Sequence, residues 1–391
     1  MESTKPKAII VGAGIAGLAT AWWLDRAGWT STIIERAASV REGGYVVSLS
    51  GCCLDTLKQM NVYDELKAGS YNYDENVVKD TKGREMLRLH YADVHGGLDS
   101  FAVCRGDLAN VLFKALPATA SIQFDQTLES VIDDGDKVKA TLKGGETIEA
   151  DLLIGTDGIR SFIRNQFWKG VDCLEDLGYS YAVYDIDEKK ELEASCVSFN
   201  SPGHLDVFYC LRNDRLAAMH IWRDDLAGLQ ERDDRFGILR KVTAGGAGQV
   251  TEIIDRADAT NSPVIIDSLT MVCLPQWSKG RVLLVGDAAH CLTLLSGQGA
   301  GMALTSAEIL GKALMATKEI PQALANHEKK LRPVIENLQR RSKKMATMYI
   351  PKSIWGYHFR NLVLKIMPNS WIASWHVSSA KVEMDLATVK T

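Results

Sequence analysis

The stretch KAIIVGAGIAG (residues 7–17) decides the fold of this chain. Its apolar first half (residues 7–11) ends at glycines, which predicts a buried strand followed by a tight turn. Ile15 to Gly28 then has the pattern of a helix that ends at a glycine, and Ser31 to Glu35 has that of a second strand. The stretch therefore predicts a βαβ unit with its glycines at the first strand-to-helix turn.

The glycines of this turn have separate tasks. Gly12 permits the tight turn, Gly14 lets a pyrophosphate approach the backbone, and Gly17 lets the helix pack closely on the strand. The helix N-terminus offers free N–H groups and its positive dipole end to phosphates. A carboxylate at the end of the second strand accepts hydrogen bonds from ribose hydroxyls. The pattern predicts a dinucleotide site, with a purely structural turn as the alternative, and its further candidate residues are Ala16, Glu35 and Arg36.

A second block, GDAAH (residues 286–290), suits the same ligand. Arg281 to Gly286 predicts a buried strand that delivers Asp287 to its C-terminal end, the edge at which open parallel sheets bind ligands. A carboxylate there can accept a hydrogen bond from a polyol, such as the ribityl chain of a flavin. A helix then opens, and its N-terminus would face the flavin pyrimidine, where negative charge develops on reduction. The residues at this helix start are Gly297, Gln298, Gly299 and Ala300. The two blocks together predict FAD, held at two points.

A third block is less specific. Asp151 to Gly155 predicts another buried strand, and an acidic turn with Asp157 follows it. Asp157 either hydrogen-bonds a ribose or caps the next helix, and the residue pattern leaves both alternatives open.

Composition excludes several functions. The net charge of −4 gives no basic field that would recruit nucleic acid. The eight cysteines show no CxxC spacing, so we predict buried thiols, no metal site and a cytoplasmic location. The uncharged run from Ala8 to Leu24 is interrupted by three glycines and is shorter than the ~20 residues of a membrane helix. It therefore predicts neither a targeting segment nor a span.

The predicted fold class is α/β, with a Rossmann-like FAD-binding domain around a parallel sheet, a second β-sheet-rich substrate domain and C-terminal helices. The expected FAD-binding parts are residues 1–172 and 271–330, the sheet-rich substrate domain is 173–270, and the C-terminal helices are 331–391. Further helices are predicted at residues 53–69, 107–116, 302–318 and 322–347. Successive strands are predicted between Tyr179 and Trp222, with a hairpin turn at Asn213-Asp214.

The three blocks, in their order and spacing along the chain, resemble those of the FAD-dependent aromatic hydroxylases of the p-hydroxybenzoate hydroxylase type. In its compact form the chain is similar to the tetracycline-inactivating monooxygenases of that family, through Arg41-Glu-Gly-Gly44, Cys104-Arg105-Gly-Asp-Leu108 and Leu295–Gly299. The resemblance implies that Arg41 lies near the flavin or the nicotinamide and that Arg105 contacts the FAD pyrophosphate. A surface salt bridge is the alternative for each arginine.

Three sites depart from the pattern of that family. Thr293 and Leu294 stand where prolines are usual, Gly301 stands where Asn is frequent, and Ser48 stands where an Asp often contacts the flavin. Because the spacing is kept, we still expect FAD to bind. The departures bear on the pose of the flavin and on how the protein handles oxygen.

The resemblance also implies a reaction. NADPH or NADH reduces the flavin, O₂ adds at flavin C4a to give a hydroperoxide, and one oxygen atom passes to an electron-rich aromatic, phenolic or enolic small molecule, polyketide-like ones included. The cofactor carries this chemistry, so we assign no catalytic side chain, and we interpret His290 as structural. One alternative is an FAD-dependent dehydrogenase or reductase that does not transfer oxygen, and another is a binding protein with a structural FAD.

The substrate should lie between the flavin and the second sheet. Alternation along Arg215 to Trp222 puts Ala218, His220 and Trp222 on one face, and we take His220 and Trp222 as candidate substrate-binding residues, with packing in a core as the alternative. We expect a monomer or weak homodimer without a membrane partner. We also expect the Trp-bearing C-terminal segment to pack as helices across the two units. A membrane-surface role is the alternative, because cations alternate with apolar residues there: Arg340, Arg341, Lys343, Lys344, Lys352, Arg360 and Lys365.

Overall fold

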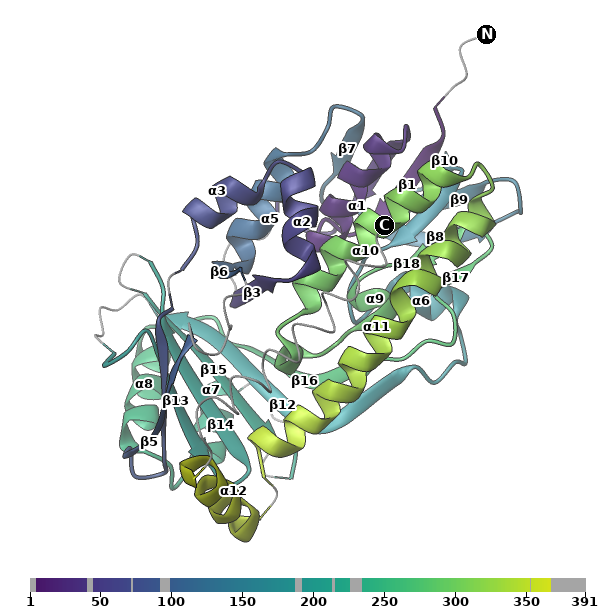
Figure 1. Ribbon diagram of the computed structural model, residues 1–391. Coiled ribbons are helices and arrows are strands. Elements are labelled where there is room, and N and C mark those ends of the chain that lie inside the picture. Colours follow the sequence, from purple (N-terminus) through teal and green to yellow (C-terminus); the bar gives the residue numbers. More distant parts are fainter. Residues whose placement is uncertain are drawn as a thin grey trace.

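The computed structural model describes residues 5–40, 45–71, 73–91, 99–186, 192–212, 215–225, 234–351 and 353–366 (Figure 1). It confirms the predicted mixed α/β class, with a parallel-strand sheet, an antiparallel sheet-rich part and C-terminal helices. None of the helices in the described ranges combines the length and apolar character that a membrane span needs. In the same ranges, no cluster of three or more His, Cys, Asp or Glu side chains could hold a metal ion.

The first sheet is parallel except at its β17 edge. Its strands follow the order β17 (Ser278–Lys279), β18 (Val282–Leu284), β11 (Leu152–Gly155), β1 (Lys7–Val11), β2 (Thr30–Ile34) and β7 (Ala120–Gln123). The predicted βαβ unit is β1, α1 (Ile15–Arg26) and β2. The fully buried run Ile9 and Ile10 explains why β1 occupies the middle of the sheet.

Several helices and two small sheets accompany this sheet. Helix α10 (Gly299–Ala316) lies beside α1 (Figure 1). The predicted helix over residues 53–69 is two helices, because Asn61 adopts a left-handed φ of 58° between them. The remaining elements of this region are α2 (Cys52–Gln59), α3 (Tyr63–Ala68), α5 (Arg105–Lys114), α6 (Phe162–Phe167), the β3 (Val46–Ser50) and β6 (Ser100–Cys104) pair, and the sheet β8 (Leu128–Asp133), β9 (Val138–Leu142) and β10 (Thr147–Ala150).

The second sheet has seven strands and is antiparallel except where β13 meets β4. The order is β16 (Ile265–Val272), β12 (Leu174–Ile186), β15 (Leu216–Arg223), β14 (His204–Cys210), β13 (Cys196–Ser201), β4 (Glu75–Lys79) and β5 (Glu85–His90). Two of its strands thus come from residues 75–90, outside the range from which the sequence predicted this sheet. β14 and β15 are antiparallel neighbours, but the predicted turn Asn213-Asp214 lies outside the described residues.

Two helices that the sequence analysis missed cover one face of the second sheet. They are α7 (Arg235–Val242) and α8 (Gly248–Ala259), which lie beside the strands in Figure 1. Their apolar side chains form a core with Phe208, Ala218 and Trp222. The signal for α8 was present, because Val250, Ile253, Ile254 and Ala257 follow helical spacing.

The C-terminal helices connect the two sheets. The long helix α11 (Ile320–Tyr349) runs from the first sheet to the second, and α12 (Ile354–Ile366) lies against the second sheet (Figure 1). Gln339 on α11 donates a hydrogen bond of 2.8 Å to the carbonyl of Val272 at the end of β16. The C-terminal segment that the sequence analysis expected to pack as helices contains three tryptophans. The structure describes Trp355, whereas Trp371 and Trp375 lie outside the described residues.

Candidate active site

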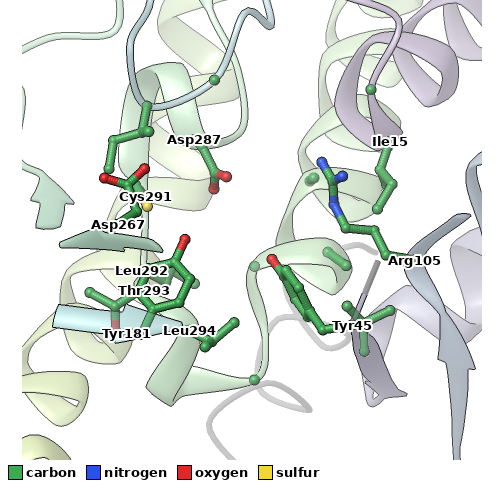
Figure 2. A pocket seen from close by; sticks show the side chains of 18 of the residues that line it. Ile15, Tyr45, Arg105, Tyr181, Asp267, Asp287, Cys291, Leu292, Thr293 and Leu294 are labelled. Carbon is green, nitrogen blue, oxygen red and sulfur yellow. The ribbon is translucent and has the colours of Figure 1, made fainter. Parts of the chain in front are cut away.

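A cavity of about 310 Å³ lies between the two sheets (Figure 2). This volume is at the lower end of the range of about 300–1,000 Å³ that is usual for small-molecule sites. One side, which we name the glycine wall, consists of Gly14, Ile15, Ala16, Arg105, Asp287, Gly297, Gly299 and Ala300. The other side, the sheet wall, consists of Tyr181, Tyr209, Met219, Asp267, Ser268, Leu269 and Thr270. The site therefore draws on both units of the fold.

The first glycine turn has the geometry that a pyrophosphate site requires. Gly12 has a φ of 107°, and a Cβ there would lie 2.7 Å from the carbonyl oxygen of Thr156. A Cβ at Gly17 would lie 1.9 Å from the carbonyl oxygen of Gly12, so this glycine allows helix and turn to touch. A Cβ at Gly14 would meet no atom within 4 Å, and no side chain caps α1. The N-terminus of α1 is thus open toward the cavity, where a phosphate can bind its N–H groups.

Glu35 lies beside this turn. Its Oε2 accepts a hydrogen bond from the N–H of Ala13 at 2.7 Å, and its Oε1 accepts one from Ala37 at 2.9 Å. The half-buried carboxylate is therefore fixed next to the glycines while it retains lone pairs for further donors. The neighbouring Arg36 is exposed and does not line the cavity.

The second block supplies the other end of the glycine wall. β18 leads to Gly286, whose φ of 65° turns the chain into the short helix α9 (Asp287–His290). A Cβ on Gly286 would lie 2.9 Å from Cβ of Ala16, so the two blocks are in contact. Gln298 precedes α10 without capping it, and its buried Oε1 accepts no hydrogen bond from the described residues. A second open helix N-terminus therefore borders the cavity.

Arg105 and Asp287 give the glycine wall its charges. Both reach the cavity, from α5 and α9 respectively (Figure 2). Asp287 is accessible from the cavity but lies deep within the protein, and this burial raises the pKa of its carboxyl group, while Arg105 opposes the increase. Open helix N-termini, a cation and a carboxylate that faces the cavity are the groups that would hold a phosphate, a polyol and a flavin ring. The residues present therefore fit FAD.

The structure does not bring every predicted residue to the cavity. Asp157 caps α6 instead, because its carboxylate accepts hydrogen bonds from the hydroxyl of Ser161 at 2.5 Å and from the N–H groups of Phe162 at 2.7 Å and Ile163 at 3.2 Å. The capping alternative thus describes Asp157 in this structure. Arg41 lies outside the described residues.

His220 and Trp222, the candidate substrate-binding residues, do not line the cavity. Both are almost fully buried on the face of β15 that α7 and α8 cover. His220 contacts Asp206 through Nδ1 at 2.7 Å and Tyr184 through Nε2 at 2.9 Å. The predicted alternation of β15 holds, but the cavity lies on the opposite face, from which Met219 contributes. The substrate-binding prediction for His220 and Trp222 is therefore corrected to packing in a core.

Aromatic residues at the cavity were missed by the sequence analysis. The phenol rings of Tyr45 and Tyr181 enter the cavity from different sides (Figure 2), and Tyr209 also lines it. Burial raises the pKa of all three phenols, so they stay protonated and can donate hydrogen bonds. Asp267, opposite Tyr181 in the sheet, accepts two hydrogen bonds of 2.8 Å from Arg160. The alternation of side chains along their strands could have pointed to Tyr181 and Tyr209. To use it, one has to know which face of the second sheet α7 and α8 cover.

His290 has a structural setting. Burial lowers the pKa of its imidazole to about 3, and the ring packs on Trp277 at 4.8 Å between centroids. The ring of His327 lies 6.0 Å from the same indole between centroids, and burial lowers its pKa to about 4. Both imidazoles are therefore neutral at physiological pH, and neither lines the cavity.

The positions that depart from the resembled family lie at or near the cavity. Ser48, Thr293 and Leu294 line it, and Thr293 adopts a φ of 69° that is rare for a β-branched residue. A Cβ on Gly301 would lie 3.2 Å from the sulfur of Cys53, which leaves little room for the larger side chain frequent there.

Comparison with known proteins shows that this chain contains an FAD-binding domain. The family model described as an FAD binding domain matches residues 5–193 and 249–342. The FAD-dependent monooxygenase asL4 of Sarocladium schorii is 30% identical to this chain, over 92% of either chain. The 6-hydroxynicotinate 3-monooxygenase of Bordetella bronchiseptica is 27% identical, over 80% of this chain and 84% of its own.

Solved structures agree. Tetracycline destructase Tet(55) superposes with a TM-score of 0.82 at 25% identity, over 97% of this chain and 98% of its own. HpxO of Klebsiella pneumoniae, complexed with FAD and uric acid, shares the fold with a TM-score of 0.82 at 22% identity, over 96% and 97% of the two chains. The chain thus belongs to the FAD-binding-domain family of aromatic-hydroxylase type, and it is an FAD-dependent monooxygenase.

Proposed function

We propose that this enzyme uses NADPH or NADH to insert one oxygen atom from O₂ into an electron-rich aromatic, phenolic or enolic small molecule. The observation that carries the proposal is the cavity between the two sheets, in which the glycine wall faces a wall of tyrosines and a methionine. The reduced FAD would supply oxygen activation at its C4a atom. The protein then has to bind, orient and desolvate the two reactants.

The glycine wall is proposed to hold the FAD. The N–H groups at the start of α1 and the guanidinium of Arg105 would bind the pyrophosphate, and Glu35 would bind the adenosine ribose. Asp287 would accept a hydrogen bond from the ribityl chain. The full set that we propose for the cofactor adds Gly12, Gly14, Ala16, Gly17, Arg36, Arg41, Gly297, Gln298, Gly299 and Ala300.

The sheet wall is proposed to hold the substrate. Met219 and Leu269 offer apolar contact to a planar ring. Tyr181 of this wall, and Tyr45 from another side of the cavity, offer hydroxyl groups to a phenol, enol or carbonyl oxygen (Figure 2). Their raised pKa values keep these hydroxyls protonated, so they would stabilise a substrate oxygen that carries negative charge. Two of the compared proteins are named for 6-hydroxynicotinate and tetracycline, which supports a ring-bearing substrate.

Substrate-stimulated turnover with isotopic oxygen tests the proposal. The purified flavoprotein would be supplied with NADPH or NADH and a panel of phenols, hydroxypyridines and polyketides. At least one compound should accelerate nicotinamide oxidation and gain one ¹⁸O atom from ¹⁸O₂. Oxidised product without label would replace the proposal with a flavin dehydrogenase, and a flavin that neither nicotinamide reduces would remove it.

A further inference from the structure

Helix α12 carries an exposed apolar face. Its exposed side chains are Ile354 (62% exposed), Trp355 (85%), Phe359 (70%) and Leu362 (56%). At 100° per residue these four positions fall on one side of the helix. Large apolar side chains that are this exposed and lie together are typical of an interaction surface, whereas single exposed apolar residues are common on any protein.

The opposite face of α12 fixes this orientation. Tyr357 is 4% exposed, and its hydroxyl donates a hydrogen bond of 3.0 Å to the carbonyl of Asn200 in β13. Arg360 donates hydrogen bonds of 2.8 Å to the side chain of Asn200 and to the carbonyl of Tyr349. The helix is therefore anchored by one face while it presents the other to solvent.

The chain around α12 has an unusual charge. Residues 337–382 contain eight Lys and Arg and no Asp or Glu, whereas the rest of the chain has 37 Lys and Arg against 49 Asp and Glu. An acidic protein thus concentrates positive charge in the segment that carries its exposed apolar helix. Among the described residues, Arg340 and Lys344 are exposed cations at the end of α11, close in sequence to α12.

We propose that α12 docks on the surface of an anionic phospholipid bilayer. Trp355, Phe359 and their apolar neighbours would enter the boundary between headgroups and acyl chains, while the cations of this segment, Arg340 and Lys344 among them, would bind the headgroups. The charge argues against a second copy of this chain as the occupant, because two such segments would place like charges together. The sequence analysis left a membrane-surface role for this segment as an alternative, and the exposed face of α12 favours that role. The proposal does not depend on which substrate the enzyme uses.

Sedimentation of the full-length protein with vesicles tests this proposal. The protein should co-sediment with phosphatidylcholine vesicles that contain phosphatidylserine, more weakly with phosphatidylcholine alone, and less in high salt. The double variant Trp355→Ser/Phe359→Ser should lower binding at least ~10-fold, and Arg340→Gln/Lys344→Gln should weaken only the phosphatidylserine-dependent part. Ile132→Ser, which changes an exposed apolar residue (60%) of β8, is the matched control and should leave binding unchanged.

Three results would overturn the proposal. The first is that the protein does not sediment with phosphatidylserine vesicles. The second is that the wild type and the Trp355→Ser/Phe359→Ser variant bind these vesicles equally. The third is that the wild type binds no vesicles and forms a dimer in light scattering, and that the variant is monomeric. The last result would assign the face to a second copy. Retained visible flavin absorbance in each variant confirms that the protein is folded.

Discussion

The two walls of the cavity offer different groups to the ligands that we propose for them. The glycine wall works largely through backbone, since its open helix N-termini and closely packed glycines leave room for a phosphate and present N–H groups to it. The sheet wall works through side chains, namely tyrosines, a methionine and the polar residues of β16. A side chain at Gly12 or Gly17 would collide with backbone, so these positions of the glycine turn are closed to substitution, whereas single substitutions on the sheet wall would change the groups that face the substrate.

The comparison extends to the two faces of β15. Met219 faces the cavity, whereas Trp222 faces the core under α7 and α8. Changes on one face should affect substrate binding, and changes on the other should affect folding. Four variants test these distinctions, in order of decreasing effect.

Trp222→Ala should cost the most, about 3–5 kcal/mol in the free energy of unfolding, because it removes a fully buried indole from the core beneath the sheet. Urea denaturation followed by circular dichroism measures this cost. The KM of the folded enzyme for its substrate should stay close to that of the wild type. A cost below about 1 kcal/mol together with a raised KM would restore Trp222 to the substrate site.

Asp287→Ala should weaken FAD binding about 10- to 100-fold, the equivalent of the about 1.5–3 kcal/mol of a hydrogen bond to a charged group. Titration of the apoprotein with FAD measures the change. Asp157→Ala is the matched control, because Asp157 caps α6 and its loss should cost about 1 kcal/mol of stability with FAD affinity unchanged. Equal FAD affinity in wild type and Asp287→Ala would remove Asp287 from the proposed cofactor site.

Acid should destabilise the region behind the glycine wall. The pKa of His290 falls from 6.5 to about 3 on folding, so the unfolded chain binds the proton first as the pH decreases. The contribution to stability is complete above pH 6.5 and is lost at about 1.4 kcal/mol per pH unit below it. His290→Asn should reduce this slope in urea unfolding at several pH values, whereas the exposed His358→Gln should not. Parallel pH profiles for wild type and His290→Asn would contradict a neutral, buried His290.

Met219→Ala should have the smallest effect, about 1 kcal/mol or a several-fold rise in the KM for the substrate, because it removes apolar contact from the sheet wall. FAD affinity should not change, since Met219 belongs to the sheet wall. The measurement is steady-state nicotinamide oxidation with the substrate that the panel identifies. A weakened FAD affinity with an unchanged KM would reverse the assignment of the two walls.

Local and non-local features of the sequence differed in what they predicted. The glycine turn of β1 and α1 was predicted to the residue, because the constraints on Gly12 and Gly17 act within one βαβ unit. Which face of β15 borders the cavity was not predicted correctly. The period of two shows which side chains share a face, but it does not show which of the two faces α7 and α8 cover. The membership of β4 and β5 in the second sheet depends on pairing with β13, which lies more than one hundred residues away in the chain.

The left-handed conformation of Thr293 has a consequence for protein engineering. Proline fixes φ near about −65°, far from the 69° of Thr293, so the proline usual in the resembled family cannot enter this backbone by a point exchange. A chimera that imports the proline-bearing loop of a relative would have to transplant the whole segment between His290 and Gly299. Evolutionary routes between the two loop types meet the same barrier, since a rearrangement of the backbone must accompany the change of residue.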